Sequence, residues 1–266
     1  MLDRRGHCIT LAAMAPPDPR HEPGAALVEA ARRWLTPVRA SLGSDFVAAC
    51  LTGSVLTSGY DPKHSHVNVL VLARTLNPAT LEGLASASPK QMRAPFFDPL
   101  FITRAELESS LDVFPIEWLD VTERYLLLAG EDVFATLVVP REQLRLQIEH
   151  DLRGKHLRLR MQWLAHAQRP SELRRSLAAN ASGYHAIFRA LLRLRGEQAP
   201  ASHAKTVDRV AAVFTLNAAA LRGAHELRYP ERRYSDAEAR ERYRAFLAEI
   251  ERLVTAIDQM PVAARP

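Results

Sequence analysis

The hydrophobic pattern of the chain changes near Pro140, and this change constrains the fold more than any other feature of the sequence. Before it, short runs rich in Val, Leu, Ile and Phe alternate with brief helical patterns, which is typical of a sheet with helices packed on it. After it, apolar residues recur at helical spacing almost to the end. The sequence therefore predicts an α/β (α+β) sheet domain followed by an all-α helical bundle.

This boundary sets the predicted domains. Residues 1–22 contain a Pro-rich stretch that cannot continue a helix, and we expect them to form a flexible leader. Residues 23–140 form the predicted sheet domain and residues 141–266 the predicted bundle. In the first domain the pattern indicates helices over 25–42 and 104–111 and strands over 46–51, 67–72, 100–103 and 116–121. In the second it indicates helices over 142–166, 171–195, 204–221 and 236–257, and Ser235 with Glu238 forms a capping-box pattern before the last.

Composition excludes several classes of protein. With 47% hydrophobic and 24% charged residues, the chain is neither disordered nor fibrous. No apolar run reaches the roughly 18 residues that suggest a membrane-spanning helix. Its two cysteines, Cys8 and Cys50, do not suggest a disulfide framework. We therefore expect a cytoplasmic protein that has no membrane partner.

The two halves differ in charge. Residues 1–140 carry 12 Lys+Arg against 16 Asp+Glu, whereas residues 141–266 carry 23 against 14. A basic half can attract a polyanion or dock against an acidic neighbour. The most basic run, Arg153 to Arg160, spreads over more than one face of its helix, so we expect it to be solvated and predict no nucleic-acid partner.

One segment carries the main functional signal, LTGSVLTSGYDPKHSHVNVLVLA, residues 51–73. An apolar strand runs into Gly53 and Ser54. After eleven intervening residues, His66-Val67-Asn68-Val69 opens a second apolar strand. A glycine here lets a ligand approach the backbone closely, and a serine can donate a hydrogen bond to it.

The segment resembles the signature of the polymerase-beta-like nucleotidyltransferase superfamily. That signature is an apolar residue, Gly, Gly or Ser, a gap of about nine to thirteen residues, and then Asp, an apolar residue, and Asp or Glu. The order of domains is also similar to that of aminoglycoside nucleotidyltransferases, in which a helical domain completes the substrate cleft. The resemblance covers residues 25–139, and beyond them only the helical character matches.

The resemblance implies a nucleotide ligand, ATP or another NTP, bound at Gly53 and Ser54. Two acids at alternate positions of a strand point to the same face and can hold two Mg²⁺ ions that stabilise phosphoryl transfer. A third acid on a neighbouring strand activates the incoming hydroxyl. By resemblance Glu117 is the catalytic candidate, and Asp120, on the opposite face of the strand expected there, is the second choice.

The two metal-binding acids are missing, because His66 and Asn68 occupy their positions. Neutral imidazole is a poor ligand for Mg²⁺, and an amide oxygen brings no charge. We therefore interpret His66 and Asn68 as degenerate metal positions and expect no bound metal. The cofactor stays unknown, with Mg²⁺ required if the protein is active. A zinc site formed by His64, His66 and Glu117 is an alternative.

The leading hypothesis is a degenerate nucleotidyltransferase, a pseudoenzyme with weak or regulatory binding of a nucleotide or a protein partner. The alternative is an active enzyme that transfers a nucleoside monophosphate from an NTP to a small hydroxylated substrate or a protein side chain. Two weaker hypotheses are an RNA-binding module, whose affinity would fall steeply with salt, and a ribonuclease using Arg145 and His150, which are spaced as in helical ribonucleases.

Overall fold

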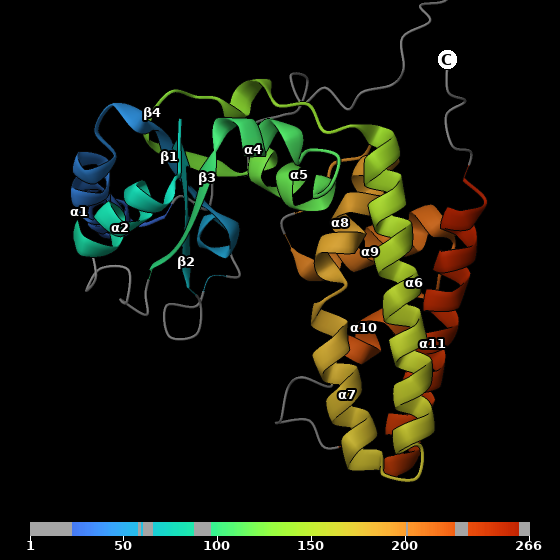
Figure 1. Cartoon of the computed structure of the whole chain (residues 1–266). Coiled ribbons are helices and arrows are strands. Elements are labelled where there is room, and N and C mark those ends of the chain that lie inside the picture. Colours follow the sequence, from blue (N-terminus) through green and yellow to red (C-terminus); the bar gives the residue numbers. More distant parts are fainter. Residues whose placement is uncertain are drawn as a thin grey trace, which may run out of the picture. The chain divides into compact units, whose positions relative to one another are not determined.

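The computed structural model describes residues 23–57, 60, 66–87, 97–200, 202–226 and 234–260. Within them the chain forms two compact units, of which one ends at Val139 and the other begins at Pro140 (Figure 1). The first contains a sheet with helices, and the second is all helical. The predicted fold class is therefore confirmed. The leader expected over 1–22 lies outside the described residues.

The sheet of the N-terminal unit has four strands in the order β3-β2-β1-β4. Their bounds are β1 (Phe46–Thr52), β2 (Val67–Ala73), β3 (Phe97–Thr103) and β4 (Tyr125–Gly130). β1 pairs antiparallel with β2 and β4, whereas β2 and β3 run parallel. The helices of this unit are α1 (Ala25–Leu42), α2 (Pro78–Ala87), α4 (Arg104–Ser109) and α5 (Pro115–Glu123).

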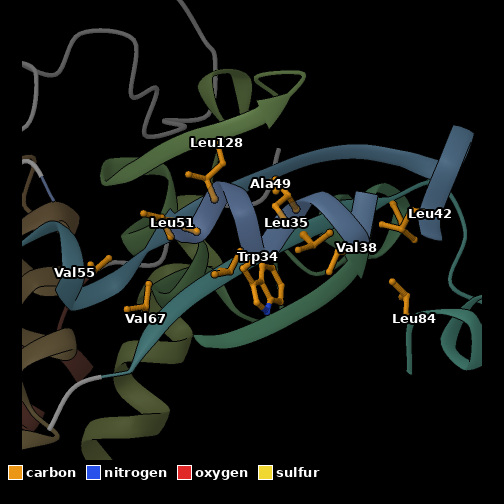
Figure 2. Close-up of a cluster of buried hydrophobic side chains, with 14 residues drawn as sticks. Trp34, Leu35, Val38, Leu42, Ala49, Leu51, Val55, Val67, Leu84 and Leu128 are labelled. Carbon is orange, nitrogen blue, oxygen red and sulfur yellow. The ribbon is translucent and has the colours of Figure 1, made fainter. Parts of the chain in front are cut away.

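Helix α1 covers one face of this sheet and forms the core with it. Its buried side chains include Trp34, Leu35 and Val38, and they pack on the odd-numbered residues of β1 and β2, such as Leu51 and Val67 (Figure 2). Because strand side chains alternate between faces, the even-numbered residues of β1 and β2 point to the other side. That second face carries Thr52 and Asn68, which pair with each other across the two strands.

The segment expected as a strand over 116–121 is instead helix α5, so this prediction is wrong. Pro115 occupies the first turn, where its missing N–H costs nothing, and Glu117 lies near the positive end of the helix dipole. Burial of Ile116, Trp118 and Leu119 follows a helical spacing rather than a strand alternation. The fourth strand is β4, directly after α5, which the sequence pattern did not indicate.

The C-terminal unit consists of six helices within the described residues. They are α6 (Arg141–His166), α7 (Pro170–Ser182), α8 (His185–Leu194), α9 (His203–Phe214), α10 (Ala218–Glu226) and α11 (Asp236–Asp258). Two of the expected helices are each divided in two, at Gly183 and at Thr215, which has a left-handed backbone (φ 55°). The capping box at Ser235 and Glu238 is present, so that prediction is confirmed.

Arg145 joins the first and last helices of this unit. It is only 7% exposed and donates hydrogen bonds from Nε to the carbonyl oxygen of Met260 and from Nη2 to that of Ile257, each at 3.2 Å. It also pairs with Glu149 at 3.2 Å. A cation at the C-terminal end of a helix satisfies carbonyl groups that have no partner within the helix. The side chain of His150, in contrast, is 86% exposed. The ribonuclease hypothesis thus relies on an arginine that already caps α11.

Three of the basic residues between Arg153 and Arg160 on α6 contact acidic or aromatic side chains. Arg153 bonds to Glu149 at 2.9 Å, and Arg160 bonds to Glu251 at 2.5 Å. The ammonium of Lys155 lies 5.5 Å from the centre of the Tyr184 ring, and burial lowers its pKa. The two ion pairs offset the charges of Arg153 and Arg160. None of the helices in the described part of the chain has the length and apolar character that a membrane crossing requires.

We predict that Gly130→Ala destabilises the N-terminal unit by about 2–4 kcal/mol. Gly130 has φ 91°, and a Cβ atom there would lie 2.1 Å from the carbonyl oxygen of Val47. Urea unfolding in a Trp163→Phe background measures this, because the remaining tryptophans, Trp34 and Trp118, both belong to the N-terminal unit. Gly24→Ala is the control, since a Cβ there meets nothing within 4 Å. Equal stability of the two variants would contradict the packing described.

We also predict that Arg145→Ala lowers the free energy of unfolding of the helical unit by about 2–4 kcal/mol, because it removes a buried donor from the carbonyl groups of Ile257 and Met260 and leaves Glu149 with Arg153 as its remaining cation. His150→Ala should change it by less than about 0.5 kcal/mol. Urea unfolding followed by circular dichroism at 222 nm measures both. A large effect of His150→Ala with a negligible effect of Arg145→Ala would refute the capping role.

Candidate functional site

Strand pairing aligns a row of polar side chains across one end of the sheet. Thr52 pairs with Asn68 between β1 and β2, and Asn68 pairs with Asp98 between β2 and β3. On the far side of β1, Thr52 pairs with Tyr125 of β4. Directly paired residues point to the same face, and neighbouring strands lie about 4.8 Å apart. The row Tyr125-Thr52-Asn68-Asp98 therefore lies on the face of the sheet opposite α1.

Gly53 and Asn68 are in direct contact, although fifteen positions separate them in the sequence. Gly53 has φ 79°, and a Cβ atom there would lie 2.8 Å from Nδ2 of Asn68. Only glycine combines this backbone with the space that Asn68 occupies. The turn after β1 and the start of β2 are therefore held together, as the motif in the sequence suggests.

A pocket of about 400 Å³ opens at this row, and helix α5 forms its opposite wall. Its polar lining residues are Thr52, Asn68, Asp98 and Glu117. Its apolar lining residues are Val69, Leu70, Pro99, Leu100, Phe114, Trp118 and Val121. Nε1 of Trp118 donates a hydrogen bond to Oγ of Ser110 at 2.9 Å, which restricts the orientation of the indole. The result is a mainly apolar pocket with carboxylates from two different elements.

The candidate third acid, Glu117, lines this pocket, but from helix α5 rather than from a neighbouring strand. The second choice, Asp120, lies one helical turn further along α5 and is not among the described lining residues. Both residues make further interactions with the protein. Glu117 and Asn68 thus line the same pocket, but Glu117 lies on helix α5 and not on the strand that was expected there.

Asp98 is the acid that the sequence reasoning missed. It lies on β3, next to Asn68 on the adjacent strand, which is where the resemblance requires a third carboxylate. We expected this strand to begin at residue 100, so Asp98 fell outside it. Proline is tolerated on an edge strand, and β3 is the edge of this sheet. The signal that could have found Asp98 is the alternation of Phe97 and Phe101, which pack on the core, with Asp98 and Leu100, which line the pocket.

The other predicted residues lie around the row without lining the pocket. Ser54 is exposed in a short 3₁₀ turn, and His66 is exposed just before β2. His64 lies outside the described residues. The structure therefore joins Gly53, Asn68 and Glu117 around one site, and it leaves Ser54 and His66 at the surface.

The site does not fit the paired Mg²⁺ ions that the resemblance implies. Among the described residues, no three His, Cys, Asp or Glu side chains come together as a metal-binding group. At the centre of the row, Asn68 offers a neutral amide where a pair of hard cations needs a carboxylate. The zinc alternative includes His64, which lies outside the described residues, so it stays a prediction.

Two further titratable groups lie on this face of the sheet, and both are held in their neutral forms. Burial, together with hydrogen bonds from its hydroxyl to Asp132 at 2.7 and 2.9 Å, raises the pKa of Tyr125. Burial, with a smaller effect of Asp132, raises the pKa of the Cys50 thiol. Neither group can then act as a base or nucleophile near neutral pH. Among the described residues that line the pocket, the carboxylates are those of Asp98 and Glu117.

Comparisons with known proteins identify no family. No protein-family model matches the sequence, and no curated protein matches it. Among solved structures, the chain is similar to spectinomycin adenyltransferase AAD(9) from Enterococcus faecialis, whose crystal structure contains ATP and spectinomycin. The identity is 12% and the TM-score 0.48, over 85% of this chain and 98% of that one. A similarity this low establishes no shared activity.

We predict that Gly53→Ala destabilises the N-terminal unit and that part of the loss depends on Asn68. The left-handed backbone costs about 1–2 kcal/mol, and the clash with Asn68 adds to it. In an Asn68→Ala background the clash disappears, so a double-mutant cycle by urea unfolding should give a coupling energy of about 1 kcal/mol. Gly43→Ala is the matched control, with φ 54° and nothing within 4 Å of its Cβ position. Zero coupling would show that the two residues are not in contact.

Proposed function

We propose that the N-terminal unit is a nucleotidyltransferase-like binding module that does not carry out two-metal nucleotidyl transfer. The observation that carries this proposal is the row Thr52-Asn68-Asp98, with Gly53 packed on Asn68. The turn, the paired strands and an acid on the neighbouring strand follow the arrangement expected of such a fold. The residue at the centre of the row is an amide.

The chemical consequence is a large loss of charge where metal ions would bind. A site with three acids carries about −3, whereas the row here carries the single charge of Asp98, with neutral Asn68 and an exposed His66 in the other positions. Metal ions contribute several kcal/mol to a phosphoryl-transfer transition state, and each 1.36 kcal/mol is about tenfold in rate. Loss of the pair therefore reduces transfer by several orders of magnitude. Binding of a ligand in the pocket does not require the metal ions.

One observation favours the alternative of an active transferase. Asp98 and Glu117 both line the pocket, so it contains two carboxylates and not one. Together they could recruit one metal ion in an altered arrangement, with an NTP as donor and a hydroxylated small molecule or protein side chain as acceptor. A protein partner and a cytoplasmic location are further predictions that rest on the sequence.

We predict that the full-length protein shows no Mg²⁺-dependent transfer from ATP, and that any affinity for ATP measured by calorimetry is the same with Mg²⁺ and with EDTA. The double variant His66→Asp/Asn68→Asp should acquire Mg²⁺-dependent ATP binding, because it restores two carboxylates on one strand face. The single variant His66→Asp is the control, since it leaves the amide in the row.

The alternative makes the opposite prediction. Mg²⁺-dependent turnover by the wild type that is lost in Asp98→Asn and Glu117→Gln would establish an active enzyme and refute the binding module. Release of pyrophosphate from each of the four NTPs, measured with a panel of hydroxylated small molecules and a protein acceptor present, detects turnover whichever of them accepts the nucleoside monophosphate. Glu82→Gln, on the exposed side of α2, is a suitable control for these two substitutions.

A further inference from the structure

The pocket beside the row has a composition that does not suit a nucleoside triphosphate. Seven of its eleven described lining residues are apolar, and none of the eleven is Lys or Arg. Its two charged residues, Asp98 and Glu117, are both acids. Like charges within a few ångströms repel unless a cation lies between them. Without bound Mg²⁺, the triphosphate of a nucleotide would meet this repulsion, whereas a positively charged ligand would be attracted.

The mouth of the pocket is apolar as well. Leu100 and Phe114 line the pocket and are 57% and 49% exposed, and the neighbouring Val113 is 57% exposed. Large apolar side chains gathered on a surface and bordered by polar groups often mark a binding site. This observation is independent of the negative charge of the pocket, and it favours a ligand with a hydrocarbon body.

Two aromatic residues line the same pocket. Trp118 is only 5% exposed, and Phe114 lies at the rim. Aromatic rings attract organic cations, by about 0.5–1 kcal/mol at exposed sites and more where water is excluded. Carboxylates and aromatic rings in one pocket of about 400 Å³ are a combination that selects for an ammonium group on an apolar body.

We propose that this pocket binds a small organic ammonium compound with an aromatic or aliphatic body, without a metal ion. The ammonium lies at the Asp98 side of the pocket, and the body lies between the sheet and α5. This inference rests on the proposed function, because metal ions held for catalysis would occupy the carboxylates. A polyhydroxylated body is disfavoured, since its hydroxyl groups would lose water against the apolar walls without gaining hydrogen bonds.

Three probes that share one body and differ in charge test the proposal: 2-phenylethylammonium, 2-phenylethanol and 3-phenylpropanoate. Ligand-observed NMR titration of the full-length protein in EDTA gives the three affinities. We expect the ammonium compound to bind about tenfold more tightly than the alcohol, and the carboxylate to bind most weakly. Such small ligands bind weakly, so the ratio of affinities is the relevant quantity.

Two variants separate the charge from the body. Asp98→Asn should bring the affinity for the ammonium compound close to that for the alcohol and leave the alcohol unchanged. Leu100→Ser should weaken both by a similar factor. Glu82→Gln, which removes an acid from α2, should change neither. Asp98 and Leu100 are both exposed, so their substitution should leave the fold intact. Circular dichroism checks this.

Equal affinities for the three probes, or a preference for the ammonium compound that Asp98→Asn does not alter, would overturn this inference. If that result came with no nucleotidyl transfer from Mg-ATP, the proposed function would stand and only the ligand class would be wrong. Mg²⁺-dependent transfer by the wild type would overturn both proposals.

Discussion

The in-register pairing of β1, β2 and β3 determines what this protein can bind. Once Thr52 is opposite Asn68 and Asn68 is opposite Asp98, alternation along each strand sends these three side chains to one face and the apolar core residues to the other. A shift of one residue would bury Asn68 against α1 and move Val67 and Val69 to the other face of the sheet. The hydrophobic core under α1 therefore fixes the geometry of the site as well as the fold.

The same constraint explains which parts of the site were predictable from the sequence. The strands at residues 46–51 and 67–72 are mainly apolar, so both strands and the turn at Gly53 could be inferred. The position of Asp98 could not be inferred, because Pro99 is atypical of a strand. The start of this edge strand is set by its pairing with β2, which the sequence pattern does not show. Glu117 was predicted on a strand because the six residues 116–121 fit the period of a strand as well as that of a helix. A proline at position 115 suits the first turn of a helix, but by itself it is a weak signal.

The helical unit shows a similar division between local and distant information. Its capping box at Ser235 is a local pattern and was predicted. The role of Arg145 could not be, because it depends on the carbonyl groups of residues more than one hundred positions away. Arg145 and His150 have the spacing seen in helical ribonucleases. In the structure, however, Arg145 is buried and caps α11, whereas the side chain of His150 is exposed to solvent. Spacing alone cannot distinguish such a pair from a catalytic one.

The central claim is that the row across the sheet no longer binds paired divalent ions, because its middle residue is Asn68. Titration with Mn²⁺ followed by electron paramagnetic resonance tests this most directly, since protein-bound Mn²⁺ loses the signal of the hydrated ion. We predict that adding the wild-type chain to micromolar Mn²⁺, alone or with a non-hydrolysable ATP analogue, leaves the signal equal to that of the matched solution without protein. Two Mn²⁺ ions bound tightly per chain, and released on Asp98→Asn, would contradict the claim.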